Sequence, residues 1–214
     1  MIVTELSRGI KLYLLVGGKG TRLSGITNGL PKPLIDVNGK TFLSRVLENL
    51  SGFNVTLICS DLNYSYYKNL GIKIFNEGEL SGTGGFLSKI DLPESFYVMN
   101  GDTFYSGNIN LDCDKTTIFV SEETILGDEG YILGDNGKVN SYIEKNINSF
   151  GKKHLVNLGI YKFYKKDLIL PKLLPISIEY DILNNIDLSY QIIETDRFDI
   201  GTPERLEKFK RWCV

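Results

Sequence analysis

The chain has 214 residues, of which 42% are hydrophobic and 23% charged, and its formal net charge at pH 7 is −2. This length and composition are typical of a globular protein with a substantial core. The near-neutral charge argues against a nucleic-acid-binding protein, which needs a broad basic surface. No hydrophobic run approaches the ~20 residues of a membrane span. Residues 1–10 lack the hydrophobic core of a signal peptide, so we expect a cytoplasmic protein without a membrane partner.

The first half of the chain alternates hydrophobic runs with segments of helical spacing, which predicts βαβ units and a mostly parallel sheet. The strands that we expect are 11–16, 54–60, 72–76 and 96–100. The helices that we expect are 41–50, 62–70 and a short one at 83–90, which Thr83 would cap.

The second half has a different pattern, with several strands in a row before the last helices. The predicted strands are 116–121, 129–133, 138–144 and 154–163, and Asp135-Asn136-Gly137 is typical of a hairpin turn. The predicted helices are 165–172, 178–185 and 203–212, the last starting at Thr202-Pro203. Cys59, Cys113 and Cys213 are far apart and odd in number, which is typical of reduced thiols.

A glycine-rich segment follows the first predicted strand. It reads Gly17-Gly18-Lys19-Gly20-Thr21-Arg22-Leu23, and Pro31-Lys32-Pro33-Leu34 comes eight residues after it. Bare backbone beside Lys19, Arg22 and Lys32 can hold a polyanion. The segment lacks the spacing of a P-loop, and Leu23 stands where a dinucleotide fingerprint has its third glycine. A solvated surface cation explains Lys19 equally well.

These two motifs together resemble the signature of the sugar-1-phosphate nucleotidyltransferases. Further landmarks of that family follow in the expected order, at residues 77–85, 100–102, 143–145, 157–161 and 199–203. The resemblance implies an α/β fold with a Rossmann-like, mostly parallel or mixed sheet flanked by helices. It also implies one catalytic domain over residues 1–214, in which 1–10 form an N-terminal extension and no hexapeptide-repeat domain follows.

The reaction that the resemblance implies is attack by a sugar 1-phosphate on the α-phosphorus of a nucleoside triphosphate, with release of pyrophosphate. Such a reaction needs positioning and charge neutralisation more than a nucleophilic side chain. Arg22 and Lys32 are our candidates for binding the triphosphate and the departing pyrophosphate. The candidate nucleotide-binding residues lie in the two glycine-rich segments, at Leu15, Gly17, Gly18, Gly20, Thr21, Gly82 and Thr83.

Two aspartates match the metal-binding positions of the family. Asp102 follows a predicted strand and the turn Asn100-Gly101, where a carboxylate can bind Mg²⁺ together with phosphate and water. Asp199, in Asp199-Ile200-Gly201-Thr202-Pro203, is assigned to the same ion by the resemblance alone, because spacing cannot pair residues 97 apart.

The candidate sugar-phosphate residues lie in the second half and next to the second glycine-rich segment. Glu144 could accept hydrogen bonds from sugar hydroxyls, Lys145 could pair with the sugar phosphate, and Asn157 and Gly159 match the sugar-contacting Asn-x-Gly pattern. The full set is Gly84, Glu144, Lys145, Asn157 and Gly159. Leu80 and Ser81 depart from the usual family pattern, which weakens any deduction of the substrate from this segment.

Several landmarks most resemble D-glycero-α-D-manno-heptose-1-phosphate guanylyltransferases, and mannose-1-phosphate guanylyltransferases share several of them. The implied substrates are GTP and a manno-configured sugar 1-phosphate for surface-glycan synthesis, although UTP, dTTP or CTP stays open as the donor. The sequence also leaves open a nucleotidyltransferase for another phosphorylated alcohol and a non-catalytic nucleotide-sugar sensor. It is equally compatible with a homo-oligomer.

Overall fold

The computed structural model describes residues 2–3, 9–18, 24–27, 29–107, 109–125, 129–144 and 149–214. These residues form a mixed α/β structure in two compact units. Unit 1 comprises residues 1–79, 99–110 and 195–214, and unit 2 comprises 80–98 and 111–194. Among the described residues, no helix is long and hydrophobic enough to span a membrane.

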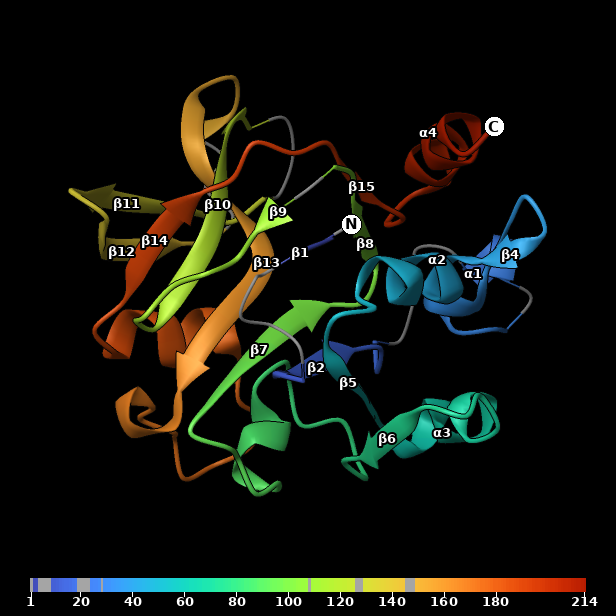
Figure 1. Cartoon of the computed structure of the whole chain (residues 1–214), viewed down its shortest axis with the longest axis horizontal. Helices are drawn as coiled ribbons and strands as arrows, with labels where there is room; N and C mark the ends of the chain where they lie inside the picture. Colours follow the sequence, from blue (N-terminus) through green and yellow to red (C-terminus); the bar gives the residue numbers. More distant parts are fainter. Residues whose placement is uncertain are drawn as a thin grey trace. The chain divides into compact units, whose positions relative to one another are not determined.

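Unit 1 contains a parallel arrangement of three strands, β2 (Lys11–Leu15), β5 (Asn54–Cys59) and β6 (Lys73–Asn76). Helix α2 (Phe42–Asn49) precedes β5, and α3 (Asp61–Tyr67) connects β5 to β6 and lies beside β6 (Figure 1). These β–α–β steps confirm the parallel pattern that the first half of the sequence predicts. Thr41 caps α2, because its hydroxyl accepts a hydrogen bond from the Ser44 amide at 3.1 Å.

The remaining elements of unit 1 are short. Two of them, β8 and β15, form an antiparallel pair, whereas β1 and β9 pair in parallel and β3 pairs with β4. Their bounds are β1 Ile2–Val3, α1 Ser24–Thr27, a 3₁₀ turn Lys32–Leu34, β3 Asp36–Val37, β4 Lys40–Thr41, β8 Thr103–Tyr105, β9 Ile109–Asn110, β15 Arg197–Asp199 and α4 Pro203–Trp212.

A cluster of aromatic rings fixes α4 against the rest of unit 1. Phe209 lies 5.2 Å from Phe42 of α2, 5.2 Å from Phe104 of β8 and 5.5 Å from Phe198 of β15, measured between ring centroids. Trp212 adds a contact with Phe198 at 4.9 Å. Buried aromatic rings contribute much of the packing energy of a core. The cluster therefore holds the β8–β15 pair, and the residues that follow it, in one position.

Unit 2 is built mainly from antiparallel strands. Its longest strand, β13 (Lys153–Tyr164), pairs antiparallel with β10 (Thr117–Thr124) and with β11 (Tyr131–Asp135). In Figure 1 the strands β11, β12 (Lys138–Ile143), β14 (Ser189–Ile192) and β10 lie together. Strands β10 and β14 pair in parallel. The prediction of a mixed sheet is thus confirmed, and the antiparallel share comes from the second half of the chain.

Strand β7 (Ser95–Asn100) runs from unit 2 into unit 1.

Within unit 2, Asn136 and Gly137 connect β11 to β12 with φ values of 49° and 77°. Positive φ at both residues is what a two-residue hairpin turn requires. The predicted turn at Asp135-Asn136-Gly137 is therefore confirmed.

The helices predicted for the second half are partly wrong. The expected helix at 165–172 is only a 3₁₀ turn over Lys165–Asp167, and Pro171 follows four residues later. Residues 178–185 form a π-helical turn, Ile178–Ile182, and a 3₁₀ turn, Leu183–Asn185, instead of an α-helix. Thr83 does not cap the short helix near it, which is a 3₁₀ turn over Gly85–Ser88, because its hydroxyl accepts a hydrogen bond from the Ile178 amide.

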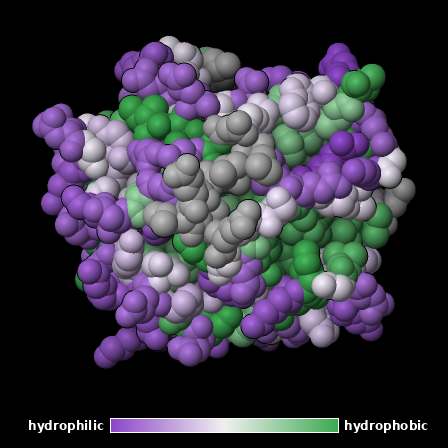
Figure 2. Space-filling model, in the orientation of Figure 1, coloured by the Kyte–Doolittle hydropathy of each residue, from purple (hydrophilic) through white to green (hydrophobic). Residues whose placement is uncertain are grey.

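Hydrophilic residues cover most of the face drawn in Figure 2, and hydrophobic residues appear between them as patches. The exposed large hydrophobic residues include Ile169 and Leu173, both near the turn at Lys165–Asp167. Scattered exposed hydrophobic residues are normal on a globular surface. They carry no functional conclusion.

Candidate functional site

The glycines after β2 lie where the chain passes close to the end of β5. A Cβ atom on Gly17 would lie 3.4 Å from Cys59 Cα and 3.4 Å from Ser60 N. The carbonyl of Gly18 accepts a hydrogen bond from the Asn63 side chain at 3.3 Å. These contacts hold the start of the glycine-rich segment at the carboxyl ends of parallel strands, where ligands bind in open α/β sheets.

Gly101 brings Asp102 to the same place. Its amide donates to the Leu15 carbonyl at 2.9 Å, and a Cβ atom at this position would come within 2.7 Å of both Leu15 O and a Val16 methyl group. Only glycine allows this approach without a shift of the backbone. Asp102 therefore lies next to the end of β2.

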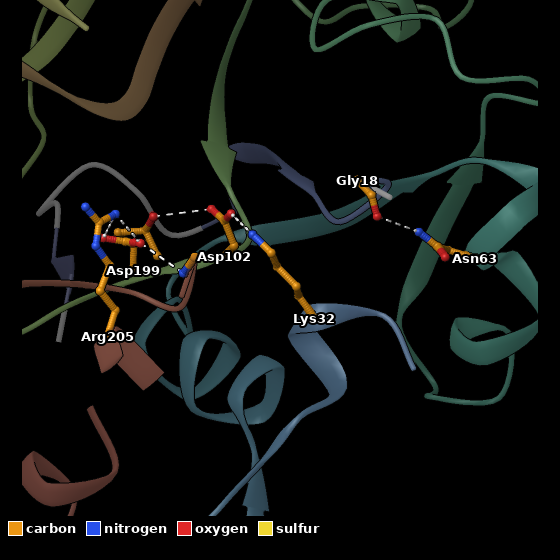
Figure 3. A network of polar contacts seen from close by, with 8 residues as sticks. Gly18, Lys32, Asn63, Asp102, Asp199 and Arg205 are labelled. Carbon is orange, nitrogen blue, oxygen red and sulfur yellow. Dashed lines mark hydrogen bonds and ion pairs between the residues drawn. The ribbon is translucent and has the colours of Figure 1, made fainter. Parts of the chain in front are cut away.

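Lys32 is the cation that the structure pairs with Asp102. Its Nζ lies 3.3 Å from Asp102 Oδ2, and the lysine side chain is 18% exposed against 42% for the aspartate. Lys32 begins the 3₁₀ turn between Pro31 and the buried Pro33, so the flanking prolines fix its backbone. Figure 3 shows this ion pair.

Asp199 reaches the neighbourhood of Asp102 through strand pairing. In the antiparallel pair β8–β15, Asp199 is opposite Thr103, and the Ile200 amide donates to the Asp102 carbonyl at 3.1 Å. Figure 3 shows the two aspartates side by side. The structure thus brings together two residues that spacing in the sequence could not pair.

Arg205 is a partner of Asp199 that the sequence interpretation missed. Its Nη1 lies 2.9 Å from Oδ1 and 3.0 Å from Oδ2 of Asp199, and the Gly201 amide also donates to Oδ1 at 2.9 Å. Arg205 lies in the first turn of α4, which Thr202 caps. The sequence could have indicated this contact, because the predicted helix 203–212 starts close to Asp199 and its first turn lies near the preceding loop.

The chemistry of these residues fits a divalent cation. Mg²⁺ commonly takes one or two protein carboxylates and fills its other positions with phosphate and water. Asp102 directly precedes β8, Asp199 ends the paired strand β15, and together they supply two carboxylates. Among the described residues, no group of three or more His, Cys, Asp or Glu side chains could form a fuller metal site.

The predicted sugar-phosphate residues of unit 2 lie in one hydrogen-bond network. Asn157 Nδ2 lies 2.8 Å from the Tyr161 hydroxyl and 3.3 Å from the Tyr142 hydroxyl, and Tyr142 donates to Glu144 Oε2 at 2.8 Å. Asn157 Oδ1 accepts from the Gly159 amide at 2.7 Å. The structure therefore joins Glu144, Asn157 and Gly159 through internal hydrogen bonds.

Thr83 belongs to the same network through Glu179. The Thr83 hydroxyl donates to Glu179 Oε2 at 2.7 Å, and the Tyr161 hydroxyl donates to Glu179 Oε1 at 3.2 Å. Tyr142, Tyr161 and Glu179 were not among the predicted site residues. The period of two in a strand could have identified both tyrosines, since Tyr142 precedes Glu144 by two residues and Tyr161 follows Gly159 by two.

Burial keeps both tyrosines protonated. Tyr161 is fully buried, and burial followed by the negative charge of Glu179 raises its pKa well above the ordinary value. Burial is also the largest cause that raises the pKa of Tyr142, with a further contribution from the charge of Glu144, against an opposing hydrogen bond from Asn157. Both phenols therefore act as hydrogen-bond donors toward the carboxylates.

Gly82, Gly84 and Gly159 each have a local reason to be glycine. A Cβ atom on Gly82 would lie 2.2 Å from Ile176 O, and one on Gly84 would lie 3.0 Å from the Ile176 side chain. Gly159 has a φ of 69° at an irregularity in the pairing of β10 with β13. Positive φ is a conformation that glycine adopts without strain. The Gly20, Thr21, Arg22 and Lys145 predictions lie outside the described residues.

Comparisons with known proteins identify relatives of this chain. A family model described as a MobA-like NTP transferase domain matches residues 12–105. Bifunctional protein GlmU of Methanocaldococcus jannaschii is 32% identical over 162 residues, which cover 72% of this chain and 40% of that protein. D-glycero-alpha-D-manno-heptose 1-phosphate guanylyltransferase of Campylobacter jejuni is 30% identical over 169 residues, which cover 73% of this chain and 76% of that protein.

Solved structures also resemble this fold. The crystal structure of HddC from Yersinia pseudotuberculosis, complexed with GMP-PN, has a TM-score of 0.79 and 27% sequence identity. The similarity covers 96% of this chain and 100% of that one. The chain spans 40% of the length of the GlmU proteins that it matches, so likeness to them concerns only part of those proteins.

Proposed function

This chain belongs to the family of sugar-1-phosphate nucleotidyltransferases, and from that premise we propose that it transfers a nucleotidyl group from a nucleoside triphosphate to a sugar 1-phosphate. The observation that carries the proposal is the group formed by Lys32, Asp102 and Asp199 near the end of β2, the strand that Gly17 and Gly18 follow in the chain. Two carboxylates and a lysine next to bare backbone suit a polyphosphate and its counterion.

The reaction forms a bond between an oxygen of the sugar phosphate and the α-phosphorus of the triphosphate. The bond from that phosphorus to the bridging oxygen breaks, and pyrophosphate leaves with the electron pair. The acceptor is already an anion, so no side chain has to remove a proton. The task of the protein is to hold two polyanions in line and to offset their charge.

Lys32 offsets charge on the triphosphate in this proposal. Its backbone is fixed between two prolines, and its present partner, Asp102, would turn to the metal when substrate binds. Arg22, which we assign from the sequence, would contact the same phosphates with its guanidinium fork. Mg²⁺, held by Asp102 and Asp199, would stabilise negative charge on the phosphoryl oxygens.

Glu144 and Lys145 would bind the acceptor. Glu144 accepts a hydrogen bond from Tyr142 at Oε2, and none of the described residues donates to its Oε1, which suits a sugar hydroxyl. We assign Lys145 to the sugar phosphate on its place in the sequence. Replacing Lys145 by Ala should raise KM for the sugar 1-phosphate more than KM for the triphosphate, whereas Arg22→Ala should impair use of the triphosphate. The same kinetic pattern in both variants would contradict the two assignments.

We infer GTP as the donor and D-glycero-α-D-manno-heptose 1-phosphate as the acceptor, with mannose 1-phosphate as the second candidate acceptor. Sequence landmarks over the whole chain support this choice, and so does the likeness to the heptose 1-phosphate guanylyltransferase of Campylobacter jejuni. Guanine differs from the pyrimidine bases in size and in its hydrogen-bond donors. A matched pocket would therefore discriminate strongly through unpaired polar groups.

A panel of four nucleoside triphosphates and several sugar 1-phosphates tests this proposal, with pyrophosphate release as the readout. We expect turnover with GTP and a manno-configured acceptor, and loss of turnover after chelation of divalent cations. Faster turnover with UTP, dTTP or CTP for every manno-configured acceptor would overturn the guanylyl assignment. Absence of turnover with all pairs would overturn the enzymatic function itself.

A further inference from the structure

Glu179 connects two parts of unit 2 that carry candidate ligand-binding residues. It lies in the π-helical turn Ile178–Ile182. Its Oε2 accepts hydrogen bonds from the Thr83 hydroxyl at 2.7 Å and the Ser177 hydroxyl at 2.9 Å, and its Oε1 accepts one from Tyr161 at 3.2 Å. Both carboxylate oxygens are therefore used inside the protein, which is unusual for a residue whose only role is contact with a ligand.

The orientation of the Asn157 side-chain amide follows from its contact with the backbone amide of Gly159. The Gly159 amide can only donate, so the atom of Asn157 that lies 2.7 Å from it must be the carbonyl oxygen. The amide nitrogen then points at the hydroxyl oxygens of Tyr161 and Tyr142, and both of its hydrogens are used. This leaves Asn157 no N–H group for a sugar.

The hydrogen bonds from Asn157 also determine the direction in which the two tyrosines donate to two carboxylates. Each phenol oxygen accepts a hydrogen bond from Asn157, so its own proton is directed elsewhere. Tyr161 donates to Glu179, and Tyr142 donates to Glu144 Oε2 at 2.8 Å. Hydrogen bonds to charged groups are stronger than those between neutral ones. The direction of every bond from Glu179 to Glu144 is therefore defined.

On its other side, Glu179 fixes the segment around Gly82. The Ile176 amide donates to Ser81 O at 2.8 Å, and the Gly84 amide donates to Ile176 O at 2.8 Å. The Ile178 amide donates to the Thr83 hydroxyl at 2.9 Å, and that hydroxyl donates in turn to Glu179. Residues 81–84 are thus joined to residues 176–179 by backbone and side chain together.

We propose that Glu179 is a positioning residue for the nucleotidyl transfer: through Tyr161, Asn157 and Tyr142 it orients Glu144 toward the acceptor sugar, and through Thr83 it fixes the segment of Gly82 and Gly84. Asn157 belongs to this chain of contacts as the branch point, not as a direct sugar ligand. The inference rests on the proposed function, since it assigns a role in that reaction.

The test replaces Glu179 by Gln, which keeps the size of the side chain but exchanges one acceptor oxygen for a donor. Either the Tyr161 bond or the Thr83 and Ser177 bonds must then be lost. We expect KM for the sugar 1-phosphate to rise about tenfold or more, because each such bond involves a charged group, while KM for the triphosphate changes less. Tyr180→Phe is the matched control, since Tyr180 lies on the same turn with a side chain that is 61% exposed.

Hydrogen–deuterium exchange supplies a readout that does not depend on activity. In Glu179→Gln, amides of residues 81–87 and 176–182 should exchange faster than in wild type and in the control. In the double variant Thr83→Val, Glu179→Gln, the loss of affinity for the sugar 1-phosphate should be smaller than the sum of the losses in the two single variants. Each single change already removes the same Thr83–Glu179 hydrogen bond.

Wild-type KM values and wild-type exchange in Glu179→Gln would overturn the inference. Faster exchange with unchanged KM would also overturn it, because Glu179 would then stabilise the fold without positioning Glu144. If the wild-type protein turns over no substrate pair, the proposed function fails and the positioning role fails with it. In that case the hydrogen–deuterium exchange of Glu179→Gln still shows whether Glu179 stabilises residues 81–87 and 176–182.

Discussion

Each aspartate of the candidate metal site is already paired with a basic side chain of the same unit. Lys32 is paired with Asp102, and Arg205 is paired with Asp199. Two neighbouring carboxylates repel each other, and these cations offset that repulsion. A divalent ion that binds both aspartates has to displace or share these partners, so Lys32 and Arg205 should influence metal affinity.

The carboxylates themselves should be essential to turnover. Asp102→Asn and Asp199→Asn should each lower kcat about 100-fold or more, because metal-assisted charge stabilisation is worth several kcal/mol and each ~1.36 kcal/mol is a factor of ten. Circular dichroism should show an intact fold, since asparagine keeps the shape of the side chain. Near-normal turnover of either variant at saturating Mg²⁺ would remove that residue from the metal site.

Arg205 should compete with the metal ion for Asp199. Its ion pair with Asp199 is partly exposed, with side-chain exposures of 39% and 31%, so the pair should be worth well under the energy of a buried one. Arg205→Ala should strengthen Mg²⁺ binding roughly two- to fivefold, because exposed pairs contribute ~0.2–1 kcal/mol and the arginine occupies the same carboxylate. Calorimetric titration measures the affinity directly.

Arg211→Ala provides the control for Arg205, because Arg211 lies on the same helix and its side chain hydrogen-bonds the Glu207 carbonyl, away from Asp199. The single tryptophan, Trp212, gives a second readout. It lies 4.9 Å from Phe198, the residue before Asp199, so its fluorescence should respond to the ion. Weaker metal binding in Arg205→Ala would show that the arginine orients Asp199 instead of competing for it.

Among the structural elements, the second glycine-rich segment is tested by a matched pair of substitutions. Gly82 and Gly78 have nearly the same φ, 85° and 80°, but only Gly82 would place a Cβ atom against the backbone, 2.2 Å from Ile176 O. Gly78→Ala should cost about 1–2 kcal/mol of unfolding free energy, which is the cost of left-handed backbone alone. Gly82→Ala should cost about 3 kcal/mol or more, since residues 81–84 must shift as well.

Urea denaturation of both glycine variants measures these costs. Equal losses at the two positions would mean that residues 176–178 yield easily to the added methyl group. That result would also weaken the inference about Glu179, because the same residues carry its contacts with Thr83.

The accuracy of the predicted helices and strands depends on which sequence pattern each prediction used. Strand 154–163 and helix 203–212 were predicted correctly, because period and capping are local and Thr202-Pro203 marks the start of α4. The helix at 165–172 was wrong. Its hydrophobic residues have helical spacing, but Pro171 lacks the amide that a continuing helix needs.

The candidate site shows the same limit. The sequence predicted Asp102 at the end of a strand, yet only the pairing of β8 with β15 brings Asp199 to it. Arg205 lies only 6 residues from Asp199 and was missed although its helix was predicted, whereas Glu179 was missed because its contact with Thr83 joins residues 96 apart. A pairing across such distances is a property of the folded chain, whereas Tyr142 and Tyr161 could have been found from strand period.

Across the protein as a whole, groups with perturbed pKa values occur in both units, and the thiols and phenols among them shift in the same direction. Burial raises the pKa of Cys59 to about 11, with smaller contributions from the charges of Glu77 and Asp61. Burial also raises the pKa of further cysteines and tyrosines, which are Cys113, Cys213, Tyr67, Tyr97, Tyr142 and Tyr161. Lys11 acts in the opposite sense, because burial and then Lys73 lower its pKa.

These shifts predict that the protein loses stability at alkaline pH. A thiol or phenol whose pKa is raised by folding stays protonated in the folded state while the unfolded chain ionises, so the unfolded state binds fewer protons. The contribution of these thiols and phenols to the unfolding free energy should therefore fall as pH rises from about 9 to about 11. Lys11 offsets part of this loss, since unfolding returns a proton to its amine in the same range.

Chemical denaturation at a series of pH values measures the loss, and Cys59→Ala identifies the share that comes from Cys59. The variant removes the thiol whose pKa folding raises to about 11, while the tyrosines have an ordinary pKa of 10.0 and contribute mainly above it. The slope of unfolding free energy against pH between 9 and 10 should therefore be smaller in Cys59→Ala than in wild type. Cys213→Ala, at a more exposed position, should change that slope less. Identical slopes in Cys59→Ala and wild type would show that Cys59 ionises as readily in the folded protein as in the unfolded chain.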